Sequence, residues 1–229
     1  MIARITQTAL FLLFAIVANT QISQNMTLVG NWNPGGFPTA GSLMYNDVWG
    51  YADCSGNEYA IMGGAAYFHF IDITNPSNPT EVVSILGGNT TTWRDMKTYS
   101  SYAYGVCDSC GEGLSVFDMS DLPNSVTMVG QYTNSFSSAH NIYIDVDNAR
   151  LYAVGTNTQS NGVIVFDLAV NPANPPEIAR MSLPGGYMHD LFVRDNIGYG
   201  NSGGNGMWVY DFTNLTNVIT LGNITSYPQ

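Results

Sequence analysis

Two columns of polar residues repeat along the chain at a spacing that could assemble a site for chemistry. The first column holds Asn46, Arg94, His140 and His189. Imidazole, carboxylate and guanidinium groups can transfer protons, ligate metals or hold polar ligands. The second column follows the first by one residue, and it holds Asp47, Asp95, Asn141 and Asp190. The predicted binding residues are Asp47, Arg94, Asp95, His140, Asn141, His189 and Asp190.

A divalent metal ion is one cofactor that this set would suit. His140, His189 and Asp190 supply imidazole and carboxylate ligands. A metal site needs three or more ligands in a suitable geometry, and spacing alone selects no metal. We therefore leave the cofactor unknown, with a divalent metal on these three residues as the candidate.

A structural interpretation competes with the functional one. A polar residue at the same place in each repeat can hydrogen-bond the backbone where a strand begins, which explains an Asp/Asn column without a ligand. The column of Asn, Arg, His and His changes type between repeats, which a scaffold device would not require. The sequence also lacks Gly-x-Ser-x-Gly and His-Glu-x-x-His motifs, so we assign no catalytic residue.

The elements that must position these columns repeat with the same period. Four apolar stretches end in aspartate, and the closing residues Asp72, Asp118, Asp167 and Asp211 are 46, 49 and 44 residues apart. The second polar column is spaced at 48, 46 and 49 residues. Four short strands in about 40–50 residues make one blade of a β-propeller. The sequence therefore predicts an all-β fold, a β-propeller with four readable four-stranded blades.

The predicted blades cover about residues 43–86, 91–132, 138–183 and 187–224 of a propeller region that spans 43–229. Residues 26–32 match the outer strands at 126–132 and 218–224, and they predict an N-terminal outer strand that closes a ring. All four blades already have an outer strand of their own. We therefore expect a fragment of a larger propeller with an open edge.

The first 20 residues have the pattern of a signal peptide. Arg4 precedes a ten-residue apolar run at 9–18, which is shorter than the ~20 residues of a membrane-spanning helix. The mature chain is expected to contain no transmembrane helix. Six Lys and Arg against 17 Asp and Glu give a net charge of −11, which argues against nucleic acid as a partner. An extracellular protein or polysaccharide remains as the expected partner.

A pair of cysteines adds one local feature. Cys107 and Cys110 have the Cys-x-x-Cys spacing, but no second pair accompanies them and the third cysteine stands apart. Structural zinc needs four ligands, and a redox motif of the thioredoxin type belongs to a βαβ context. The pattern favours a local disulfide or two free thiols in a hairpin.

These motifs resemble a known family. Residues 71–76 and 164–167 look like the LVIVD repeat, and the ordered motifs at 45–50, 93–95, 138–141 and 189–190 resemble the choice-of-anchor B proteins. The resemblance covers about residues 27–222. It implies a secreted or cell-surface bacterial β-propeller outside the cytoplasm. It implies no defined reaction, because this family is named for its architecture.

The expected function is that of a binding or interaction module at the cell surface. The sequence does not decide whether the protein is an enzyme, and it favours a protein without enzymatic activity. The alternative is a metal-assisted hydrolase or lyase that acts on an extracellular polymer, with its site at the channel mouth. Propellers host many functions, so the fold does not decide between the two.

Overall fold

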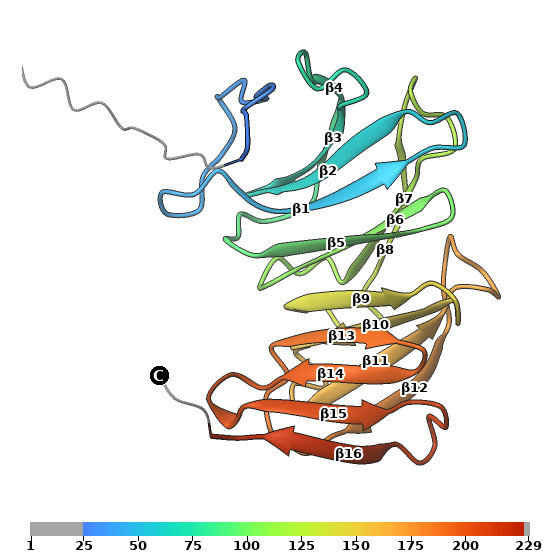
Figure 1. The fold of residues 1–229 in the computed structure, drawn as a ribbon. Coiled ribbons are helices and arrows are strands. Elements are labelled where there is room, and N and C mark those ends of the chain that lie inside the picture. Colours follow the sequence, from blue (N-terminus) through green and yellow to red (C-terminus); the bar gives the residue numbers. More distant parts are fainter. Residues whose placement is uncertain (1–24, 227–229) are drawn as a thin grey trace, which may run out of the picture.

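The computed structural model describes residues 25–226, and these form four antiparallel sheets of four strands each (Figure 1). The first blade contains β1 (Tyr45–Ala52), β2 (Glu58–Gly64), β3 (Tyr67–Asp72) and β4 (Thr80–Leu86). The second contains β5 (Arg94–Tyr99), β6 (Tyr102–Cys107), β7 (Leu114–Asp118) and β8 (Thr127–Tyr132). The third contains β9 (Asn141–Asp145), β10 (Arg150–Val154), β11 (Gly162–Asp167) and β12 (Glu177–Ser182). The fourth contains β13 (Asp190–Arg194), β14 (Ile197–Asn201), β15 (Met207–Asp211) and β16 (Ile219–Ile224).

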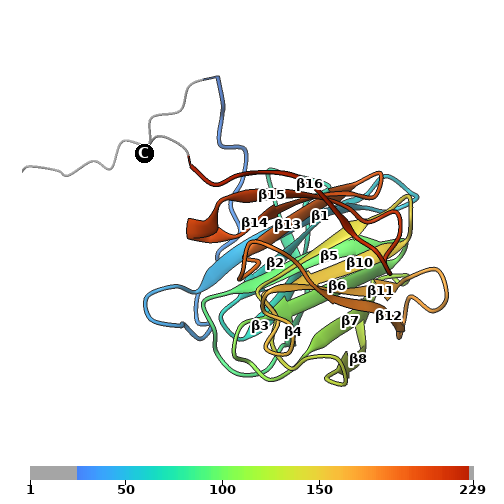
Figure 2. The ribbon, with the colours of Figure 1, turned by 90° about the horizontal axis from the view of Figure 1, so that it is seen from below.

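Within each blade the strands pair in chain order. The innermost strands β1, β5, β9 and β13 lie beside one another, so successive blades follow an arc (Figures 1 and 2). The prediction of an all-β propeller with four four-stranded blades is confirmed. The predicted signal peptide at 1–20 lies outside the described residues. No helix within 25–226 is long and apolar enough to cross a membrane.

The repeated aspartates end the third strand of each blade for a structural reason. Their Oδ1 atoms each accept a hydrogen bond at 2.8 Å from the backbone N–H two residues further on. Such Asx turns mimic a backbone turn and stop the strand. The four aspartates are Asp72, Asp118, Asp167 and Asp211.

Apolar side chains fill each seam between neighbouring blades. Phe68 and Phe70 of the first blade meet Phe117 of the second, with ring centroids 5.0 and 5.3 Å apart. Two further clusters join the second blade to the third and the third to the fourth. Strands buried on both faces explain why the apolar runs are nearly continuous. These seams make the blades one packed unit.

The fourth blade keeps an apolar face exposed within the described part of the chain. Phe192, Tyr199 and Leu221 are 42%, 43% and 55% exposed. Blades of a propeller pack face to face, and the corresponding faces of the middle blades are covered. The arrangement is that of a segment of a larger propeller.

Residues 26–32 carry no strand and lie against the first blade. Together with side chains of β2 and β3 they line an apolar groove of about 780 Å³. Gly30 lies so close to the carbonyl oxygen of Pro76 that a Cβ there would clash. Trp32 packs on buried His69, with ring centroids 5.2 Å apart. The pairing of this segment with a last blade stays a prediction.

Candidate functional site

The seven predicted binding residues line one depression of about 420 Å³, which we call the mouth pocket. The second column begins the innermost strands, with Asp95 in β5, Asn141 at the start of β9 and Asp190 at the start of β13. His140 and His189 precede β9 and β13 directly. Because each blade starts its innermost strand at the same end, residues from all four repeats reach one place. Their role in binding remains a prediction.

The second column links neighbouring blades through hydrogen bonds. Asp95 Oδ2 accepts from the Asn141 side chain at 2.8 Å and from the Ile142 backbone N–H at 2.7 Å. Asn141 Oδ1 accepts in turn from the Leu191 N–H at 3.4 Å. These carboxylate and amide groups therefore serve the start of the next blade's innermost strand. Asp190, in the fourth blade, is exposed.

Asp95 also forms a buried ion pair. Lys97 Nζ lies 2.5 Å from Asp95 Oδ1, and the same ammonium lies 4.6 Å from the centre of the Trp49 ring. Burial raises the pKa of Asp95 to about 7, although the Lys97 charge opposes that change. The side chain of Lys97 is thus held by the protein on two sides.

The guanidinium of Arg94, a predicted binding residue, is bound to backbone groups of the protein. Its guanidinium donates to four backbone carbonyls, with the Nε bond to Gly64 at 2.8 Å and a bond to Gly87 at 2.6 Å. The cation also lies 5.0 Å from the centre of the Phe68 ring. The residue is 2% exposed. These hydrogen bonds join β5 of the second blade to the first blade and to the segment that follows β4, and a role of Arg94 in binding remains a prediction.

The two histidines of the first column lie in contact. The ring centroids of His140 and His189 are 4.2 Å apart. His140 Nδ1 donates to Asp108 Oδ2 at 2.6 Å, since an ionised carboxylate only accepts. This hydrogen bond raises the pKa of His140, while burial acts in the opposite direction. The pair gives the pocket an imidazole of fixed orientation.

The residues present do not make a metal site by themselves. Within 25–226 no three side chains of the His, Cys, Asp and Glu types are grouped so that they could hold a metal ion. Asp108 occupies one nitrogen of His140. The pairing of His140, His189 and Asp190 as metal ligands therefore receives no support from the donor set.

Sequence reasoning missed Asp108 and the aromatic part of the pocket. Trp93 lines it and is 57% exposed, and its ring centroid lies 6.2 Å from that of His140. Tyr143 and Phe192 also line it, with ring centroids 4.8 Å apart. These two rings stand two residues after the second column, so the period-2 alternation of a strand could have found them. Asp108 has no equivalent in the other blades, so no repeated pattern in the sequence indicates it.

Neither a family model nor a curated protein matches the sequence. Solved structures do match. The chain is similar to a functionally unknown protein from Desulfotomaculum acetoxidans, with a TM-score of 0.58, 15% identity, and coverage of 81% of this chain and 57% of that one. It is similar to a periplasmic gluconolactonase from Pseudomonas aeruginosa, with a TM-score of 0.56, 11% identity, and coverage of 77% and 53%.

A third similar structure is the computationally designed Ika8 protein, with a TM-score of 0.55, 11% identity, and coverage of 80% and 49%. The chain thus spans about half the length of these structures. At such identities the likeness shows the fold alone, and one fold hosts many activities. The class that fold and neighbours define is a protein of the β-propeller type.

Proposed function

We propose that this chain belongs to an exported β-propeller that binds carbohydrate at the mouth pocket. The observation that carries the proposal is the pairing of exposed aromatic rings with imidazole and carboxylate groups in one depression. A volume of about 420 Å³ falls within the usual size of ligand pockets, roughly 300–1,000 Å³.

Aromatic rings supply the apolar part of such a site. Trp93 is 57% exposed, and Tyr143 and Phe192 line the pocket with their rings 4.8 Å apart. Exposed rings of this size offer flat apolar area at little cost in side-chain entropy. The C–H face of a sugar ring is a partner that matches a flat apolar surface.

Polar groups of the pocket favour a neutral sugar over a polyanion. The carboxylate of Asp190 and the imidazole of His189 are exposed and can bond hydroxyl groups. The two strong cations beside them, Arg94 and Lys97, are bound to protein groups. Since the whole chain carries a net charge of −11, a polyanionic ligand would meet repulsion.

Three observations support a location outside the cytoplasm. They are the pattern of residues 1–20, the resemblance of the repeats to the choice-of-anchor B proteins, and the likeness to a periplasmic gluconolactonase. A surface module that holds a neutral polysaccharide is consistent with all three.

A hydrolase is the second candidate, and the contact between His140 and Asp108 favours it. A histidine oriented by a carboxylate is the usual arrangement of a general base. One of the similar structures is a gluconolactonase, so the reaction to test is the hydrolysis of a lactone. This candidate needs no metal, unlike the metal-assisted version considered from the sequence.

Binding assays with named polysaccharides test the proposal. We expect the mature protein to bind a neutral polymer among laminarin, xylan and galactomannan in affinity electrophoresis, and to leave alginate unbound. Trp93→Ala should weaken that binding by about tenfold, the loss of one stacking contact. Tyr199→Ala removes an exposed ring that does not line the pocket, 43% exposed against 57% for Trp93, and serves as the control. Absence of binding to all three neutral polymers would contradict the proposal.

The rival activity has its own assay. Hydrolysis of glucono-1,5-lactone is followed in a pH-stat against the uncatalysed rate. A rate that the protein raises and that His140→Gln abolishes would favour the hydrolase. Binding of a neutral polymer without any such rate would favour the module.

A further inference from the structure

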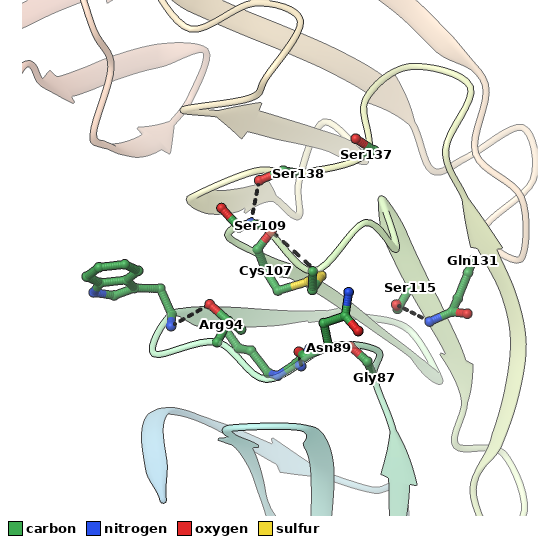
Figure 3. Close-up of a disulfide and its surroundings, with 12 residues drawn as sticks. Gly87, Asn89, Arg94, Cys107, Ser109, Ser115, Gln131, Ser137 and Ser138 are labelled. Carbon is green, nitrogen blue, oxygen red and sulfur yellow. Dashed lines mark hydrogen bonds between the residues drawn. A yellow bond between two sulfur atoms is a disulfide. The ribbon is translucent and has the colours of Figure 1, made fainter. Parts of the chain in front are cut away.

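We propose that the Cys107–Cys110 disulfide is a positioning device, which holds Asp108 against His140 and so fixes the orientation of that imidazole in the mouth pocket. Residues 107–110 have the sequence Cys-Asp-Ser-Cys, so the bridged cysteines flank Asp108 directly. Both cysteines are 2% exposed. Figure 3 shows the bridge, which joins Cys107 at the end of β6 to Cys110 in the loop that follows.

The loop is held to the entries of two blades. The Asp108 N–H donates to the Trp93 carbonyl at 3.1 Å, just before β5. The Ser109 N–H donates to Ser138 Oγ at 2.9 Å, just before β9 (Figure 3). The Ala139 N–H donates to the Cys107 carbonyl at 3.2 Å. These bonds place Asp108 between Trp93 and His140, two side chains of the mouth pocket.

The backbone inside the ring that the bridge closes has an unfavourable conformation. Ser109, between the two cysteines, has φ 59°. A non-glycine residue at positive φ costs free energy, so the open loop would favour other conformations. A short covalent ring restricts these alternatives. Without it, Asp108 would leave His140 in a large share of conformers.

Reduction offers a reversible way to remove the constraint. A thiolate of dithiothreitol attacks one sulfur of the bridge and forms a mixed disulfide, and its second thiol then closes a six-membered cyclic disulfide. The protein gains two electrons and two protons and ends with two thiols, while dithiothreitol is oxidised. Any effect of reduction on ligand binding rests on the proposed function. The effect of reduction on the orientation of the His140 ring is independent of the proposed function.

The test observes the His140 ring in the mature protein without a ligand. Side-chain ¹⁵N spectra report the proton on Nδ1, and its exchange with water reports the hydrogen bond to Asp108. We expect Cys107→Ser with Cys110→Ser to speed this exchange by about tenfold, the loss of one charge-assisted hydrogen bond. Asp108→Ala should give the same spectrum and exchange rate. In the Asp108→Ala background the cysteine changes should have no further effect at His140.

Cys54 provides the matched control, because it is a free and exposed cysteine in the first blade. Cys54→Ser should leave the His140 signals unchanged, and it is also the background in which wild-type Cys107 and Cys110 are reduced with dithiothreitol. Near-ultraviolet circular dichroism and two labelled thiols per chain confirm a folded, reduced sample. If the double variant does not fold, this reduced sample replaces it.

Unchanged Nδ1 exchange in a folded sample without the disulfide would overturn the proposal. General unfolding on reduction would overturn it too, because the bridge would then support the fold rather than one side chain. Failure of every polysaccharide to bind would affect the proposed function alone, since the His140 readout requires no ligand.

Discussion

The mouth pocket has a closed side and an open side built from the same two columns. On the closed side, Arg94, Asp95 and Lys97 are buried and bonded to protein groups of the first three blades. On the open side, His189 and Asp190 are exposed. The repeat supplies equivalent backbone positions on both sides. The difference lies in what packs next to each position.

This contrast teaches how one repeated position can serve two purposes. Where a following blade presents its backbone, a carboxylate of the column binds it, as Asp95 binds the Ile142 N–H. Asp190 belongs to the last described blade, and no following blade of the described residues presents a backbone group to it, so its carboxylate faces the pocket. Substitutions on the closed side should therefore cost stability, and substitutions on the open side should cost binding.

The largest expected effect is on the closed side, at Asp95. Asp95→Ala leaves the buried Lys97 without its carboxylate and the Ile142 N–H without its acceptor. Loss of one member of a buried ion pair lowers the free energy of unfolding by about 4 kcal/mol. Urea denaturation of both proteins measures the change. Asp147→Ala, in an exposed turn, is the control, and a loss at Asp95 no greater than at Asp147 would refute the closed-side assignment.

Arg94 tests the same side with a change that keeps the charge. Arg94→Lys cannot reproduce the four bonds to carbonyls, because an ammonium lacks the planar fork of the guanidinium. We expect a loss of about 3 kcal/mol in the free energy of unfolding. Arg180→Lys, on an exposed arginine paired with Glu177, should lose less than about 1 kcal/mol. Equal losses at the two arginines would show that the buried carbonyl bonds add nothing.

The sequence contained enough information to predict the blades. Apolar stretches that end in Asp72, Asp118, Asp167 and Asp211 set the strand ends, because each aspartate forms the turn that follows. The period of the polar columns then placed their residues where the innermost strands begin. Equivalent positions in a repeat lie side by side, so the meeting of the two polar columns at one pocket followed from spacing.

The direction of individual side chains did not follow from spacing. Arg94 donates to backbone carbonyls. Because every residue has a backbone carbonyl, the sequence does not indicate which of them will accept the bond. Asp108 reaches His140 across 32 residues and from another blade, and it has no counterpart in the other repeats. Such contacts depend on the path of one loop, which the Cys107–Cys110 bridge shapes.

The pH dependence of the free energy of unfolding tests the contact between Asp108 and His140. The Asp108 bond raises the pKa of His140, so the folded protein binds that proton more tightly than the unfolded chain. The stabilisation is complete below the unfolded pKa, about 6.5, and it is lost as the pH rises through the higher folded pKa. Asp108→Ala should thus lower the free energy of unfolding by about 1 kcal/mol at pH 5.5 and by less at pH 9.

Thermal unfolding of wild type and variant at both pH values measures this difference. In a His140→Gln background the pH dependence of the Asp108 effect should vanish, since no imidazole remains to titrate. An Asp108 effect that grows from pH 5.5 to pH 9 would show that the carboxylate does not stabilise the imidazolium.

The smallest effect on stability is expected at Asp190, which occupies the same column as Asp95 but lies exposed on the open side. Asp190→Ala should change the free energy of unfolding by less than about 0.5 kcal/mol, as surface substitutions usually do. Under the proposed function it should also weaken binding of the neutral polysaccharide by about tenfold, through the loss of a hydrogen bond to a sugar hydroxyl. Asp195→Asn, at an exposed carboxylate in the turn after β13, keeps the net charge equal to that of the Asp190 variant, and asparagine tolerates the φ of 52° at this position. If Asp190→Ala destabilises the protein as much as Asp95→Ala does, the column is structural throughout and the open side has no separate purpose.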